Sequence, residues 1–208
     1  MITLGPTLMG TLIDRTSTAL LQGLNDPANE QVWREFDVRY RPILIGFARR
    51  MGLGDADAAD MAQEALLRFL QSYREGHYDR ERGRLRSWLT GIARNCLRDM
   101  RRRAERRREH RGLSAIGALP GEDEIDAAWD AECERAILKR GLEELRTTTR
   151  TDERTIHAFE RLILDDRAPA DVASELSITL NEVYLAKHRC LKRLRKIIER
   201  LEEAYEIR

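Results

Sequence analysis

The sequence predicts an all-α protein in which a flexible linker joins two small helical domains. Only 13 glycines and 5 prolines occur in 208 residues, so few points along the chain interrupt a helix. Apolar side chains recur at steps of three and four residues in both halves of the chain. Between the halves, residues 111–128 lose this spacing and gather glycine, proline and acidic side chains, as linkers do.

The N-terminal half divides into an extension at 1–30, which matches no pattern, and a domain at 31–110. Three amphipathic helices are expected in that domain, beginning near residues 32, 55 and 85. Their apolar stripes would bury one another in a small bundle. Pro42 lies inside the first stripe and predicts a kink or a broken turn there.

The second domain, at 129–208, ends in a helix-turn-helix pattern. Pro169 suits the first turn of a short helix, and residues 177–179 form a break. Thr179 and Glu182 then form a capping box that starts a longer helix. Ser177 stands where a turn glycine is common. An ordinary helical hairpin is the alternative interpretation, because capping boxes occur in many helices.

The charge pattern indicates a polyanionic partner. The chain has 37 basic and 36 acidic residues, but residues 76–113 carry 13 basic and 5 acidic side chains. Residues 187–200 carry 7 and 1, whereas residues 114–150 carry 5 and 9. Two basic blocks separated by an acidic one predict two contacts with a polyanion. A solvated helix face is the alternative for either block taken alone.

The longer helix of the helix-turn-helix would enter the major groove of duplex DNA. Phosphate contacts are expected from its basic residues, and base contacts from its exposed start. Glu182 is alternatively used by the cap. The predicted DNA contacts are Thr179, Asn181, Glu182, Tyr184, Leu185, Lys187, His188, Arg189, Lys192 and Arg193.

Several classes of protein are disfavoured. No apolar run approaches the roughly 20 residues that cross a bilayer, and the opening segment lacks a signal-peptide pattern, so we expect a cytoplasmic protein without membrane insertion. Cys96, Cys133 and Cys190 lack C-x-x-C spacing, which predicts buried thiols and neither disulfides nor a zinc site. Nucleotide-binding and nucleophile motifs are absent, so we expect no enzyme activity, no cofactor and no metal.

Two segments of the N-terminal domain resemble region two of bacterial RNA polymerase sigma factors. They are DADAADMAQEALLRFLQSY at 55–73 and GRLRSWLTGIARNCLRDMRRR at 83–103. The helix-turn-helix resembles region four of the same proteins. With no room for a region-three domain between them, this order is similar to the extracytoplasmic-function (ECF) group of the sigma-70 family. The resemblance implies an alternative sigma factor that binds core RNA polymerase, directs it to specific promoters and helps melt the minus-ten element.

The third helix of the N-terminal domain is the predicted contact with the melted minus-ten element. Binding a single strand requires basic side chains for phosphates and rings or pockets for bases. Arginines and an asparagine on this helix can project to one solvent-exposed face, and Trp88 and Asn95 also match the family signature. Trp88 lies on the core stripe as well. The predicted contacts are Trp88, Arg94, Asn95, Arg98, Arg102 and Arg103.

The resemblance also implies protein partners. In the family, the second helix docks on the clamp helices of the largest polymerase subunit, and the matching residues here are Asp57, Asp60, Gln63 and Glu64. A solubilising acidic surface is the alternative. The helix-turn-helix would bind the minus-thirty-five element of promoter DNA. Many members are held inactive by an anti-sigma factor, which the linker would permit. The rival function is a conventional helix-turn-helix regulator that binds duplex DNA without sigma activity.

Overall fold

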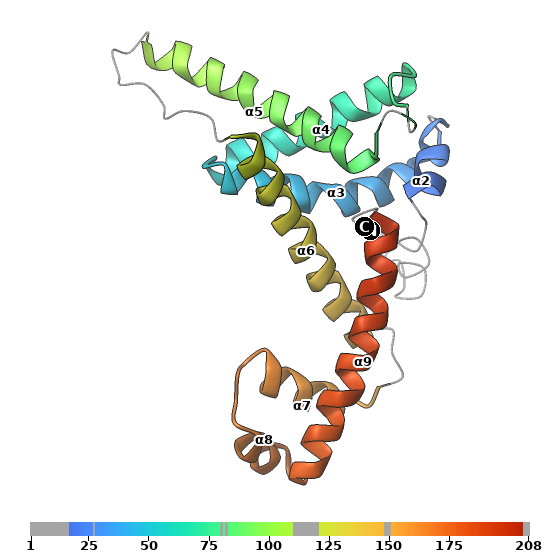
Figure 1. Cartoon of the computed structure of the whole chain (residues 1–208), viewed down its shortest axis with the longest axis vertical. Helices are drawn as coiled ribbons and strands as arrows, with labels where there is room; N and C mark the ends of the chain where they lie inside the picture. The colour runs from blue at the N-terminus through green and yellow to red at the C-terminus, as the bar shows by residue number, and fades with distance from the viewer. Residues whose placement is uncertain are drawn as a thin grey trace. The chain divides into compact units, whose positions relative to one another are not determined.

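The computed structural model describes residues 17–26, 28–79, 81, 83–109, 121–147 and 151–205. Among these residues the chain forms eight α-helices and no strand (Figure 1), which confirms the predicted all-α class. None of the described helices is long and apolar enough to cross a membrane. The helices are α2 (Ser17–Leu24), α3 (Glu30–Arg50), α4 (Asp55–Arg74), α5 (Leu85–Glu109), α6 (Glu122–Thr147), α7 (Glu153–Ile163), α8 (Pro169–Leu176) and α9 (Leu180–Tyr205).

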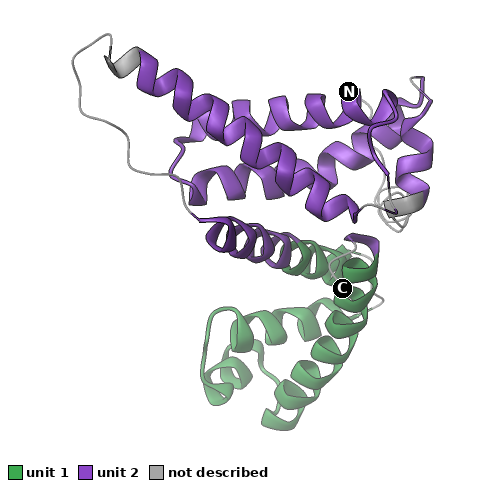
Figure 2. Ribbon diagram, turned by 45° about the horizontal axis from the view of Figure 1, so that its top comes forward, with its two compact units in different colours: residues 1–14, 137–203 green, residues 15–136, 204–208 purple. Residues whose placement is uncertain are grey.

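The described residues divide into two compact helical units, which Figure 2 colours separately. Unit 2 takes its described residues from 15–136, together with Ala204 and Tyr205. Unit 1 takes its described residues from 137–203. The division falls inside α6, after Ala136, and not at the predicted boundary between residues 128 and 129.

The three predicted N-terminal helices form the centre of unit 2 as α3, α4 and α5. Asn29 starts α3 by accepting a hydrogen bond from the Val32 N–H at 3.2 Å. Fully buried Phe36 of α3 stacks on fully buried Phe69 of α4, with ring centroids 4.4 Å apart. Leu89 of α5 is also fully buried. The apolar stripes therefore meet in one core.

Helix α2 belongs to this core, although residues 1–30 are predicted to lie outside the domain. Leu20, Leu21 and Leu24 are buried. Gly23 lets α2 approach α3 closely, because a Cβ atom there would lie 2.8 Å from a methyl carbon of Val32. The described part of unit 2 therefore begins before residue 31, where the domain was predicted to start. Residues 1–16 lie outside the described residues.

Pro42 does not break α3, which runs without interruption from Glu30 to Arg50. A proline lacks the N–H that would bond to the carbonyl four residues earlier, which here belongs to Val38. Pro42 is exposed and Val38 is 47% exposed, so water can reach this side of the helix. The expected broken turn is wrong because the freed carbonyl lies where solvent can satisfy it.

The predicted linker at 111–128 is partly helical, since α6 begins at Glu122, while residues 111–120 lie outside the described residues. Ile125 and Trp129 are buried in unit 2, and Trp129 meets Phe47 edge-on at 5.8 Å. The side chain of Glu132 is 5% exposed and pairs with Arg50. The acidic composition suggested a loose linker, but these apolar residues at a spacing of four bury the first half of α6.

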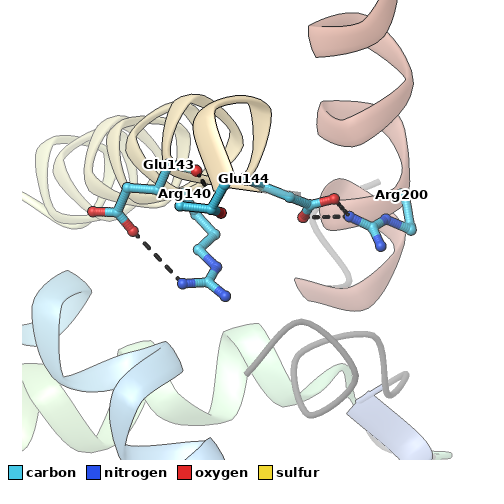
Figure 3. Close-up of polar contacts among 5 residues, drawn as sticks. Arg140, Glu143, Glu144 and Arg200 are labelled. Atoms are coloured by element: carbon cyan, nitrogen blue, oxygen red, sulfur yellow. Dashed lines mark hydrogen bonds and ion pairs between the residues drawn. The ribbon is translucent and has the colours of Figure 1, made fainter. Parts of the chain in front are cut away.

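Unit 1 contains the second half of α6 with α7, α8 and most of α9. A small core joins Ala158, Val172, Val183 and Ala186, with Leu162, Ala173, Leu176 and Ile178 packed against it. Gly141 of α6 lies close to α9, because a Cβ atom there would be 3.1 Å from Leu194. Figure 3 shows Glu144 of α6 pointing to Arg200 of α9, with which it forms an ion pair. These contacts hold α9 against α6 within the unit.

Candidate nucleic-acid and polymerase interfaces

One face of α5 carries most of the predicted minus-ten contacts. Trp88, Asn95, Arg98 and Arg102 follow one another at steps of seven, three and four residues, which places them on one side of the helix. The opposite side buries Leu89 and other apolar residues in the core. Asn95 and Arg102 are exposed, and Arg98 is partly exposed. The face therefore offers an amide and two guanidinium groups to solvent.

Trp88 is held between two other rings. Its ring stacks on Tyr78 at 4.8 Å with an interplanar angle of 27°, and it meets buried Phe69 edge-on at 5.1 Å. Trp88 therefore connects the core of unit 2 to the segment between α4 and α5. Sequence reasoning missed Tyr78, because this segment has no periodicity and its ring partner lies ten residues further along the chain.

Arg94 lies at the edge of the α5 face, where it pairs with the first turn of α6. Its Nη1 donates to Glu122 Oε1 at 2.6 Å, and the two side chains are 31% and 74% exposed. Arg86 pairs in the same way with Asp130, one further acid of α6. The acidic half of α6 thus neutralises part of the basic charge of α5.

Arg103 does not share the stripe of Asn95, Arg98 and Arg102. It is exposed, but it follows Cys96 by seven residues and so projects from a different side of α5. Burial raises the pKa of Cys96 to about 11, and the positive charges of Arg68 and Arg103 act against that rise. Arg103 is therefore accessible to solvent, as expected, but lies outside the stripe of the other arginines, and its contact with DNA stays a prediction.

The predicted polymerase contacts lie on the outer side of α4. Asp57, Asp60 and Gln63 are exposed, and the Glu64 side chain is 46% exposed. Glu64 accepts from Arg68 Nε at 2.8 Å, and Arg68 Nη1 also donates to Asp99 of α5 at 2.9 Å. The hydrogen bond from Arg68 holds the pKa of Asp99 below its ordinary value. Glu64 therefore belongs to a network that ties α4 to α5.

An apolar side chain that sequence reasoning missed lies in the middle of this acidic surface. Leu67 is 52% exposed and follows Asp60 by seven residues and Glu64 by three. It lies on the polar side of the helix, off the apolar stripe, and this position is the signal that could have found it. An exposed leucine among carboxylates is the composition of a protein-binding surface with an apolar centre.

The helix-turn-helix pattern is present in unit 1 as α8, a short turn and α9. Ser177 ends α8 with φ 53° and ψ 50°, in the left-handed region that favours glycine. Its N–H bonds to the Ser174 carbonyl at 3.3 Å, and the Ile178 N–H bonds to the Ala173 carbonyl at 3.0 Å. These two bonds form a Schellman motif, which closes α8 without the expected turn glycine.

The predicted capping box starts α9. Thr179 donates to Glu182 Oε2 from its backbone N–H at 2.7 Å and from its hydroxyl at 2.8 Å. The Glu182 N–H returns a bond to the Thr179 hydroxyl at 3.2 Å. The bonds from the Thr179 backbone and hydroxyl lower the pKa of Glu182. Of the two roles considered for Glu182, the structure shows the cap.

The other predicted contacts of α9 lie mostly on its exposed side. Lys187 is partly exposed, and Arg193 donates to the Thr151 hydroxyl. Leu185 and Arg189 border a cavity of about 200 Å³ at the start of α7, beside Arg154. The exposed residues are Thr179, Asn181, Glu182, Tyr184, Leu185, His188, Arg189, Lys192 and Arg193. The helix thus presents a basic surface that begins with polar and apolar residues.

The three cysteines are buried and free, which confirms the prediction of buried thiols. Burial raises the pKa of Cys133 to about 12 and also raises that of Cys190. Since the thiolate is the reactive form, these thiols are poor nucleophiles at neutral pH.

Part of the N-terminal half of the chain is similar to a known protein family. Residues 37–107 match the family model for sigma-70 region 2. The matched segment extends from α3 into α5 and includes both the acidic face of α4 and the basic face of α5. No curated protein matches the chain. The match supports a sigma-factor role in RNA polymerase binding and promoter melting.

Proposed function

We propose that the protein is an alternative sigma factor of the ECF type, acting in the cytoplasm. One observation carries the proposal: the segment similar to sigma-70 region 2 exposes an acidic face on α4 and an amide-and-arginine face on α5. The α4 face, with Asp57, Asp60, Gln63 and Glu64, would bind the clamp helices of the largest polymerase subunit. The α5 face would hold the melted minus-ten strand, and α9 would read the minus-thirty-five duplex.

The chemistry of the α5 face suits a single strand. Arg98 and Arg102 attract phosphates and release counterions from the nucleic acid. The carboxamide of Asn95 both donates and accepts hydrogen bonds, so it can pair with the edge of an unpaired base. Trp88, held between Phe69 and Tyr78, fixes the start of this face. An anti-sigma factor is a further predicted partner, for which no residue provides a specific argument.

Run-off transcription with purified core RNA polymerase tests the proposal. Templates are fragments of the genome that encodes the protein, and core enzyme alone is the control. We expect promoter-dependent transcripts only when the protein is added. If the protein binds duplex sites tightly but yields no such transcript from any template, the conventional helix-turn-helix regulator is the correct function.

A further inference from the structure

Three large apolar side chains lie exposed at the start of α9. Leu180, Tyr184 and Leu185 are 49%, 50% and 42% exposed, whereas Leu194 and Leu201 of the same helix are buried. Apolar surface left in water is unfavourable roughly in proportion to its area. A cluster of this kind on a helix that otherwise buries its apolar stripe indicates a contact surface.

The surroundings of the cluster identify its partner. Tyr184 and Leu185 follow Asn181 by three and four residues and precede His188 by four and three, so all four share one face. Lys187, Arg189 and Lys192 flank that face with positive charge. A polyanion with apolar groups accessible to a helix satisfies both features. In the major groove of duplex DNA, the 5-methyl group of thymine is such a group.

The capping box supports this assignment because it engages Glu182, an acidic side chain that could otherwise contact a base. Glu182 could otherwise accept a hydrogen bond from cytosine N4. Instead, its Oε2 accepts two hydrogen bonds from Thr179, at 2.7 and 2.8 Å. Asn181 and Arg189 then supply the polar contacts at this end of α9, and Tyr184 and Leu185 supply the apolar ones.

We propose that Tyr184 and Leu185 determine DNA specificity by contacting thymine 5-methyl groups in the major groove. The proposal rests on the proposed function of α9 as a reader of duplex DNA and adds the chemical group that it recognises. It implies that the preferred duplex contains thymines whose methyl groups, as distinct from their hydrogen-bonding edges, contribute to affinity.

Uracil substitution tests the proposal, because uracil differs from thymine only by the missing methyl group. The full chain is first used to select duplexes from a randomised pool, and each thymine of the selected site is then replaced singly. At one or more positions we expect affinity to fall about three- to fivefold, as for exposing one methyl group. In Leu185→Ala or Tyr184→Ala, the fall should disappear at the position that the missing side chain contacts.

Leu164→Ala is the matched control. Leu164 is 46% exposed in the same unit but follows α7 and does not belong to α9, so this variant should keep the full effect of uracil. Thermal unfolding checks that each variant is folded. Two results would overturn this inference without affecting the proposed function of α9. In the first, uracil leaves the affinity unchanged at every thymine position. In the second, the effect of uracil persists in both α9 variants. If no duplex is selected at all, the proposed function of α9 fails as well.

Discussion

At the scale of single residues, Ser177 holds the turn of the helix-turn-helix in a conformation that glycine adopts more easily. The left-handed conformation is about 1–2 kcal/mol unfavourable for a residue with a Cβ atom. Glycine avoids this strain but loses more freedom on folding. We expect Ser177→Gly to raise the free energy of unfolding by about 1 kcal/mol. Ser177→Ala should not raise it, because alanine keeps the Cβ atom that causes the strain. Urea denaturation measures both, and a glycine variant less stable than the wild type would contradict the argument.

Glu182 should make the stability of unit 1 depend on pH. Hydrogen bonds from the Thr179 backbone and hydroxyl lower its pKa in the folded state. The stabilisation is therefore present above the pKa of the unfolded chain, about 4.3, and is lost as pH falls through the lower folded value. We expect the wild type to exceed Glu182→Gln in stability near pH 7, with the difference shrinking in acid. Thermal unfolding of both proteins from pH 3 to 7 checks this, and a pH-independent difference would refute it.

The residues of local motifs were predictable, whereas those defined by distant partners were not. Thr179 and Glu182 could be paired from their spacing alone, because a capping box involves four consecutive positions. Tyr78 gave no signal, since its importance depends on a stack with Trp88 that only the folded chain creates. Arg103 is exposed as expected, but the helical period places it beside the stripe of Asn95, Arg98 and Arg102 and not within it.

At the scale of elements, α6 shows how a charged composition can hide a buried helix. The acids of residues 122–128 suggested an exposed linker, yet Ile125 is buried on the same side of the helix as Trp129 and Cys133. The acids find partners on other helices: Glu122 pairs with Arg94, and Glu132 with Arg50. Such pairing needs elements far apart in sequence and could not be predicted from the local pattern.

Close approach of α6 to α3 depends on Gly46. A Cβ atom there would overlap the carboxylate of Glu132, which is buried and paired with Arg50. We expect Gly46→Ala to lower stability by about 1–2 kcal/mol, despite the better helix propensity of alanine. Gly91→Ala is the control, because nothing lies within 4 Å of its added Cβ, and it should raise stability slightly. Equal effects of the two changes in chemical denaturation would exclude the steric explanation.

The first turn of α6 should weaken the binding of single-stranded DNA to α5. Glu122 accepts a hydrogen bond from Arg94, so a DNA phosphate must displace Glu122 before Arg94 can bind the phosphate. We expect Glu122→Gln to raise affinity for a minus-ten single strand severalfold, as charge-assisted contacts are released. Asp123→Asn removes the same charge at an exposed neighbouring position and should have a smaller effect. Fluorescence anisotropy measures the affinities.

A double-mutant comparison isolates the ion pair from the change in net charge. In a protein that already carries Arg94→Ala, Glu122→Gln should raise the affinity for single-stranded DNA by no more than Asp123→Asn does. If Glu122→Gln and Asp123→Asn raise affinity equally in the unaltered background, the ion pair with Arg94 has no specific influence on DNA binding.

At the scale of the whole molecule, the all-α fold class and the presence of two helical units could be predicted, but the residues that belong to each unit could not. Helical periodicity revealed α3, α4, α5, α8 and α9. It could not assign Leu20 and Leu24 of α2, or Trp129 of α6, to the core of unit 2. Short apolar segments carry no information about which distant surface they bury against, so unit 2 extends beyond the predicted domain on both sides.

The division into two units predicts that two functions can be separated by single substitutions. Asn95 is exposed on α5 of unit 2, and Arg189 is exposed on α9 of unit 1. Asn95→Ala should reduce open-complex formation without changing affinity for core RNA polymerase, because the α4 face is intact. Arg189→Ala should weaken recognition of the upstream duplex by about 1–3 kcal/mol if it contacts a base. Permanganate footprinting, duplex binding and polymerase titration measure the three quantities. An equal loss of polymerase affinity in both variants would contradict the assignment, since neither residue belongs to the α4 face.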